Sequence, residues 1–122
     1  MVFGLFKKDK DTSEIDILLA EIDRLGRRMG GLTSMEENDR ARVIGTFKLD
    51  VIINSISDMK PMLNDARNQV LAGKIETKKL AAEFSTFSQS VSEYHNYLDV
   101  VNQQGNEEIK FFIERPGIES YF

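Results

Sequence analysis

The stretch that decides the fold is Leu80–Val101, which reads LAAEFSTFSQSVSEYHNYLDVV. A strand would repeat every two residues, whereas the large apolar residues here recur at alternating steps of four and three. This heptad spacing predicts an α-helix with one apolar stripe, and the shortage of opposite charges beside the stripe favours a bundle of three or more helices. The stripe residues are Leu80, Phe84, Phe87, Val91, Tyr94, Leu98 and Val101.

One part of this predicted helix, from Phe84 to Ser92, has no charged side chain. Serine is a mediocre helix former, so this part must be held by whatever packs against it. Two interpretations are open. The first is a helix buried on two sides of its own bundle. The second is a surface that faces a partner, and it makes Ser85, Ser88 and Ser92 candidate partner-binding residues.

Two earlier segments have the same three-four spacing. The first begins at Ser13 and ends before Gly30, and the second runs from about Ser34 to Ala72. Arginines in the last turn of the first segment complement the helix dipole, and glycine suits a helix end. The stripe residues are Ile15, Leu18, Ile22, Leu25 and Met29 in the first segment, and Leu49, Ile52, Ile56, Met59, Leu63, Ala66 and Val70 in the second.

The second segment contains Pro61, a residue that breaks or kinks the interior of a helix. The three-four spacing continues through Pro61 and places it away from the stripe, where a kink would leave the packed face undisturbed. We therefore predict one long kinked helix from about Ser34 to Ala72. The alternative is two helices that are split near Met59.

The sequence thus predicts an all-α fold. We expect an antiparallel three-helix, coiled-coil-like bundle with a long kinked second helix and an extended C-terminal arm. Residues 1–12 would form an apolar and basic N-terminal tail, residues 13–104 the bundle, and residues 105–122 an apolar arm. A chain of 122 residues has room for one such domain.

The N-terminal tail, which reads MVFGLFKK, combines apolar residues with Lys7 and Lys8. Such a segment can bind the surface of an anionic membrane, or it can fold onto its own bundle or a neighbouring subunit. The free energy gained by burying its apolar side chains nearly cancels the cost of ordering the backbone, so one copy would bind a membrane weakly. Phe3, Leu5 and Phe6 are its candidate contact residues.

The C-terminal arm is rich in large apolar residues. Left in solvent, it would promote aggregation, so we expect it to dock. Its own bundle and a groove or sheet edge on a partner are equal alternatives as the docking surface. The candidate contact residues are Ile109, Phe111, Phe112, Ile113, Tyr121 and Phe122.

Composition excludes several kinds of chemistry. The chain has no cysteine, which rules out disulfides, thiolate nucleophiles and cysteine-ligated metals. His95 is the one histidine, so the paired Glu-x-x-His ligands of di-metal bundles cannot form, and we expect His95 to pack or hydrogen-bond at the edge of the bundle. A net charge of -4 without a basic face argues against nucleic-acid binding.

These observations predict a non-enzymatic helical subunit that mediates protein–protein assembly, with no catalytic residue, cofactor, metal or small-molecule substrate. The partner would be another protein or a second copy of the chain. The alternative is a peripheral membrane adaptor that is anchored by residues 2–8. We expect a cytoplasmic location, either free or peripheral to a membrane, because the sequence contains neither a secretory leader nor a run of ~20 apolar residues.

Overall fold

The computed structural model describes residues 10–103 and 119–122, and within these ranges the chain is helical and has no strand. The all-α prediction is therefore confirmed. The α-helices in the described ranges are α2 (Ser13–Arg28), α3 (Glu37–Thr46), α4 (Asp50–Leu71) and α5 (Ala81–Gln103). Two short 3₁₀ helices, η1 (Gly30–Ser34) and η2 (Thr77–Leu80), lie in the connections.

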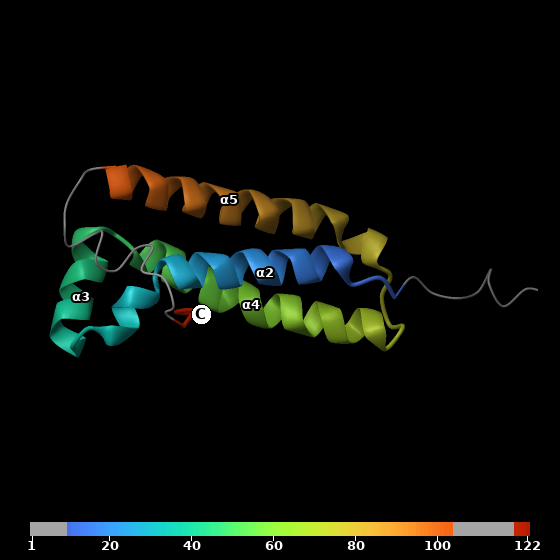
Figure 1. Cartoon of the computed structure of the whole chain (residues 1–122). Helices are drawn as coiled ribbons and strands as arrows, with labels where there is room; N and C mark the ends of the chain where they lie inside the picture. Colours follow the sequence, from blue (N-terminus) through green and yellow to red (C-terminus); the bar gives the residue numbers. More distant parts are fainter. Residues whose placement is uncertain (1–9, 104–118) are drawn as a thin grey trace, which may run out of the picture.

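The three long helices lie side by side, and α2 contacts both α4 and α5 (Figure 1). α2 and α5 run in the same direction, whereas α4 runs in the opposite direction. The short helix α3 lies beyond the end of α2 and is turned out of line with the long helices. This arrangement leaves α2 as the helix on which the other two long helices pack.

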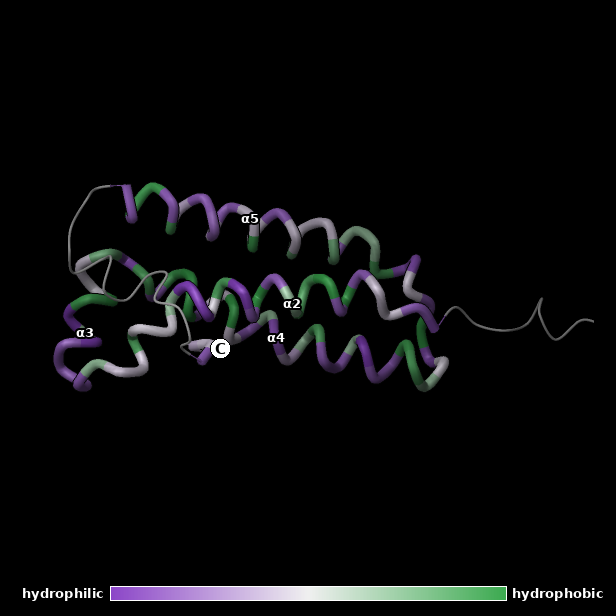
Figure 2. The backbone as a smooth tube through the Cα atoms, in the orientation of Figure 1, coloured by the Kyte–Doolittle hydropathy of each residue, from purple (hydrophilic) through white to green (hydrophobic). Residues whose placement is uncertain are grey.

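The core consists mainly of the predicted stripe residues. Phe84, Val91 and Leu98 are 5%, 2% and 0% exposed, and the stripes of α2 and α4 are buried with them, apart from the partly buried Ala66. Figure 2 shows hydrophobic and hydrophilic positions alternating along the three long helices. Full burial of a large apolar side chain contributes about 1.5–3 kcal/mol, so this shared cluster holds the helices together.

The second predicted helix is divided in the structure, so the prediction of one continuous helix is wrong. Residues 47–49 separate α3 from α4, and Lys48 adopts the left-handed conformation with a φ of 54°. The N–H of Leu49 donates to the carbonyl of Ile44 over 2.9 Å, and the N–H of Lys48 donates to that of Gly45 over 3.3 Å. These two hydrogen bonds form a Schellman motif, which ends a helix.

Pro61, in contrast, lies inside α4, which continues through it. The alternative of two helices split near Met59 is therefore also wrong. Pro61 is exposed, so its ring disturbs none of the core contacts of α4. The chain turns instead at Lys48, where α3 leaves the direction of α4 (Figure 1).

The end of α4 has the same geometry as the end of α3. Gly73 has a φ of 71°. The N–H of Lys74 donates to the carbonyl of Gln69 over 2.9 Å, and the N–H of Gly73 donates to that of Val70 over 3.0 Å. Glycine adopts this conformation without a steric cost, which is why the sequence marks this end clearly.

Polar contacts hold the start of α2, at the end of the bundle opposite α3 (Figure 1). The hydroxyl of Thr77, in the connection between α4 and α5, donates to the carbonyl of Asp11 over 2.5 Å. Nε of Arg67 on α4 donates to the carboxylate of Asp16 on α2 over 2.8 Å. The start of α2 is thus held by α4 and by the connection between α4 and α5.

Candidate functional site

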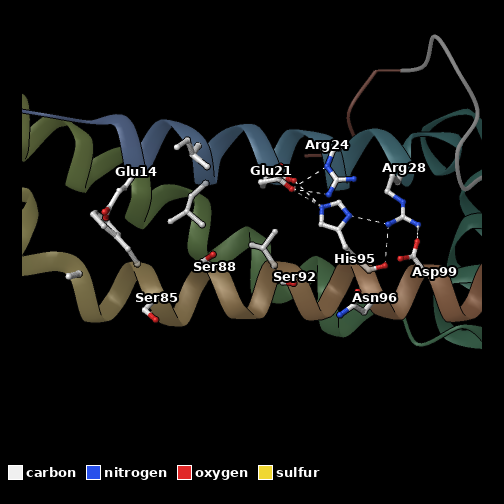
Figure 3. A pocket seen from close by; sticks show the side chains of 15 residues that line it. Glu14, Glu21, Arg24, Arg28, Ser85, Ser88, Ser92, His95, Asn96 and Asp99 are labelled. Carbon is white, nitrogen blue, oxygen red and sulfur yellow. Dashed lines mark hydrogen bonds and ion pairs between the residues drawn. The ribbon is translucent and has the colours of Figure 1, made fainter.

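A groove of about 850 Å³ lies between α2 and α5 (Figure 3). Both helices contribute charged, polar and apolar side chains to its walls. The lining residues are Glu14, Ile17, Leu18, Glu21, Arg24 and Arg28 of α2, and Ala81, Phe84, Ser85, Ser88, Val91, Ser92, His95, Asn96 and Asp99 of α5.

Each helix contributes a regular stripe to the groove. The α2 stripe comprises the five lining residues other than Leu18, which step by three and four from Glu14 to Arg28. The α5 stripe comprises four small residues that step by four, three and four, namely Ala81, Ser85, Ser88 and Ser92. Residues at these steps share one face of a helix, so each helix carries a second stripe beside its core stripe.

The groove is open because the side chains of the α5 stripe are small. Alanine and serine do not fill the space that a leucine or phenylalanine would occupy, so the space between the helices stays accessible. The floor is apolar and consists of the buried residues Leu18, Phe84 and Val91. Ile17, which is 63% exposed, adds a large apolar side chain beside this floor.

Contacts of Arg28 join α2 to α5 at one end of the groove. The guanidinium donates to the carboxylate of Asp99 over 2.5 Å and to the main-chain oxygen of His95 over 3.1 Å. The same guanidinium lies 3.1 Å from Nδ1 of His95. The side chain of Arg28 is 11% exposed and that of Asp99 is 54% exposed, so solvent still reaches the carboxylate side of this ion pair.

His95 is buried between Arg28 and Glu21 (Figure 3). Its Nε2 lies 3.4 Å from the main-chain oxygen of Glu21 and 3.6 Å from the carboxylate of the same residue. Burial, followed by the positive charges of Arg24 and Arg28, lowers the pKa of His95 from 6.5, while Glu21 acts in the opposite direction. The expectation that His95 packs and hydrogen-bonds is confirmed.

Most charged side chains of the groove lie toward one end. Glu14 lines the opposite end, whereas the arginines Arg24 and Arg28 lie with the acidic residues Glu21 and Asp99 (Figure 3). Arg24 lies 3.0 Å from the carboxylate of Glu21, and both side chains are well exposed. Because a guanidinium carries five N–H donors, Arg24 can bind a second carboxylate while it keeps this contact.

A second contact region lies between α2, α4 and residues 119–122. The N–H of Tyr121 donates to the carbonyl of Gly26 over 2.9 Å, and Nζ of Lys60 donates to the main-chain oxygen of Phe122 over 2.9 Å. The rings of Tyr121 and Phe122 meet edge to face, with centroids 5.4 Å apart. Both rings pack against the core cluster, so this short segment is held by two helices of its own chain.

Gly26 permits the close approach of this segment to α2. A Cβ at Gly26 would lie 1.9 Å from the hydroxyl of Ser120 and 3.0 Å from the main-chain nitrogen of Phe122. Glycine inside a helix costs about 0.5–1 kcal/mol relative to alanine. At this position the chain therefore has a less stable helix but gains contact with residues 119–122.

The structure brings one group of predicted partner-binding residues together. Ser85, Ser88 and Ser92 are exposed and line the same groove. Tyr121 and Phe122 are half-buried and contact α2 and α4 instead. The remaining predicted residues, which lie outside the described ranges, are Phe3, Leu5, Phe6, Ile109, Phe111, Phe112 and Ile113.

Sequence reasoning missed the α2 side of the groove. The residues concerned include Glu14, Ile17 and Arg24, which line the groove opposite the α5 stripe. A second three-four spacing in α2 could have indicated them. That spacing is a weak signal, however, because charged residues on one face of a helix usually face solvent.

In the described ranges, no group of three or more His, Asp or Glu side chains is placed to hold a metal ion. Every buried side-chain nitrogen or oxygen in the same part of the chain has a hydrogen-bond partner. None of the helices described here is both long enough and apolar enough to cross a membrane.

Comparison with known proteins identifies no relative. No protein-family model matches the chain, and neither curated proteins nor solved structures give a match.

Proposed function

We propose that this chain is a non-enzymatic helical subunit that associates with another protein chain through the groove between α2 and α5. In this proposal α2, α4 and α5 act as an antiparallel, coiled-coil-like three-helix bundle, and the groove receives a further helix. The observation that carries the proposal is the presence of a three-four stripe on each side of an apolar floor.

The dimensions of the groove favour a helix as its occupant. From Glu14 to Arg28 the α2 stripe covers about four turns, or ~21 Å at ~1.5 Å per residue. A helix lying along this length could place residues at three-four spacing against Ile17 and the α5 stripe. The small side chains of the α5 stripe would allow the ~8–10 Å separation between helix axes that is usual for packed helices.

The titratable groups at the groove support a structural role. Arg28 binds Asp99 and the main chain of His95, and His95 itself faces Glu21. These contacts connect α2 to α5. Small-molecule sites are lined mainly by apolar and aromatic side chains, whereas this groove has serines and charged residues around a narrow apolar floor.

A site-specific cross-linking experiment tests this proposal. A photo-activated cross-linking amino acid is placed at Ser88 of the full chain in the cells that produce it, and the adducts are identified by mass spectrometry. We expect one dominant protein adduct, attached through a helical segment of the partner, because Ser88 faces the groove. A Ser92→Trp substitution, which fills the groove, should abolish the adduct.

The matched control carries the same cross-linker at Asn68, an exposed residue of α4 that does not line the groove. This position should give no dominant adduct. Equal and diffuse labelling from Ser88 and Asn68, or an adduct that persists with Ser92→Trp, would contradict the proposed function.

A further inference from the structure

We propose that His95 is a pH-sensitive latch between α2 and α5. In the neutral state Nδ1 of His95 accepts a hydrogen bond from the guanidinium of Arg28, and a proton taken up at Nδ1 expels this guanidinium. Both side chains belong to the wall of the groove, so the latch operates with or without a partner bound there.

The contacts of the ring determine where the proton of neutral His95 lies (Figure 3). Nη1 of Arg28 lies 3.1 Å from Nδ1. A guanidinium can only donate, so Nδ1 is the acceptor and carries no proton. The ring proton of the neutral form is therefore on Nε2, which lies 3.4 Å from the main-chain oxygen of Glu21 and 3.6 Å from its carboxylate. Either oxygen can accept from this N–H.

Protonation of Nδ1 removes the acceptor that Arg28 uses on the ring. The new N–H of the ring would point at an N–H of the guanidinium, and both groups would carry a positive charge. The same Nη1 also donates to the main-chain oxygen of His95 over 3.1 Å. When Nη1 leaves the ring, both of its contacts with His95 are therefore lost.

Asp99 provides an alternative position for the displaced arginine. Nη2 of Arg28 donates to the carboxylate of Asp99, whose side chain is well exposed. The guanidinium can therefore turn toward solvent and keep this ion pair while Nη1 leaves His95. Buried residues such as Leu25 and Leu98 still hold the two helices together, so the change is confined to the polar contacts at this end of the groove.

The charged groups around His95 determine the pH at which the latch opens. On α2, Glu21 attracts a protonated ring, whereas Arg24 and Arg28 repel it; on α5, Asp99 pairs with Arg28. Burial, followed by the charge of Arg24, lowers the pKa of His95 from 6.5, and Arg28 adds to this effect. Departure of Arg28 relieves part of it, so proton uptake and release of Arg28 favour each other. The latch should open as the pH falls below about 6.5.

NMR of the isotope-labelled full chain tests the neutral state. His95 is the one histidine, so its ring gives a single set of signals. Correlation of the ring protons with the ring nitrogens distinguishes a protonated nitrogen from an unprotonated one. At about pH 7.5, above the ordinary pKa of histidine, we expect Nδ1 to be unprotonated and Nε2 to be protonated. A proton on Nδ1 at this pH would overturn the proposal.

A pH titration of the same sample tests the release of Arg28. Nuclear Overhauser contacts between the Arg28 side chain and the His95 ring should be lost, and the Nε–H signal of Arg28 should shift with the same midpoint as the ring signals. In His95→Gln, which cannot take up this proton, the Arg28 signal should stay constant between about pH 7.5 and pH 5.5. Contacts that persist after the ring is protonated, or an equal shift in His95→Gln, would contradict the latch.

A pair of arginine variants tests the coupling in the opposite direction. Arg28→Gln removes a positive charge and a donor to the neutral ring, so it should raise the pKa of His95. Arg27→Gln is the matched control, because Arg27 is an exposed arginine of the same helix that pairs with Asp23 and does not line the groove. It should leave the pKa of His95 unchanged.

Far-UV circular dichroism shows whether both arginine variants keep their helices. An unchanged pKa of His95 in a folded Arg28→Gln chain would overturn the proposal. If Arg28→Gln does not fold, the tautomer and the titration of the wild type decide the matter without it.

Discussion

α2 carries two stripes of three-four spacing, and the structure treats them differently. The core stripe, which includes Ile15 and Ile22, meets large apolar side chains of α4 and α5 and is sealed from solvent. The other stripe of α2, which lines the groove and was named the α2 stripe, lies opposite the small residues of the α5 stripe, and the space between them stays open. Spacing therefore determines which residues share a face, whereas the size of the opposing side chains determines whether that face closes.

The test with the largest expected effect on stability makes the same isoleucine-to-alanine substitution on each stripe of α2. Ile22 is 1% exposed, so Ile22→Ala should lower the free energy of unfolding by about 2–5 kcal/mol through lost contacts and a cavity. Ile17→Ala on the groove side should change it by less than about 0.5 kcal/mol. Urea unfolding followed by circular dichroism, at a concentration where the chain is monomeric, measures both values. Equal losses would mean that the groove face is sealed as well.

A second test concerns the contact of α2 with residues 119–122. At Gly45 a Cβ would meet no atom within 4 Å, so Gly45→Ala should stabilise the chain by about 0.5–1 kcal/mol through helix propensity. Gly26→Ala gains the same propensity but displaces Ser120 and Phe122. We expect its stability to fall below that of Gly45→Ala by about 1 kcal/mol or more.

Hydrogen exchange gives a separate reading of the same contact. The amide of Tyr121 donates to Gly26 in the wild type and should lose its protection in Gly26→Ala, while Gly45→Ala should leave that protection unchanged. Full protection of Tyr121 in Gly26→Ala would show that residues 119–122 adapt to the added methyl group.

The smallest expected effect concerns pH. The pKa of His95 is lowered in the folded chain, mainly by burial. The unfolded chain therefore binds more protons below about pH 6.5, and the free energy of unfolding should fall as the pH is lowered through this region. His95→Gln removes the titrating group and should flatten the curve between about pH 7.5 and pH 5.5.

Urea unfolding midpoints at several pH values compare the stability of wild type with that of His95→Gln. The lowered pKa values of Asp11 and Asp16 are common to both and act at more acidic pH, below 3.8, so they do not disturb the comparison. Parallel curves for wild type and His95→Gln would show that the burial of His95 has no net effect on stability.

The helices and their core could be predicted because an apolar stripe is a local property of the sequence. Phe84, Val91 and Leu98 needed only their spacing to be assigned to the core, and the predicted end at about Ala72 is followed by Gly73, which has a positive φ. The end of α3 could not be predicted in this way. Non-glycine residues rarely adopt the left-handed conformation, and a lysine such as Lys48 gives no warning of it.

The candidate site could be predicted on one side only. The absence of charge drew attention to Ser85, Ser88 and Ser92, which line the groove. Its opposite wall depends on the rotation and position of α2 relative to α5, which the spacing within each helix does not fix. The contact between Arg28 and Asp99 joins residues 71 apart in sequence, and it too depends on how α2 is placed relative to α5.

The left-handed conformation of Lys48 also makes the rotation of α4 about its axis independent of that of α3. Within one continuous helix, each inserted residue rotates everything that follows by about 100° and would turn a core stripe toward solvent. The corner interrupts that rotation, so the inward-facing positions of α4 are counted from Leu49 and not from the start of α3. The rotation of α4 about its own axis is therefore independent of the length of α3, whereas the placement of Val43, the buried residue of α3, is not.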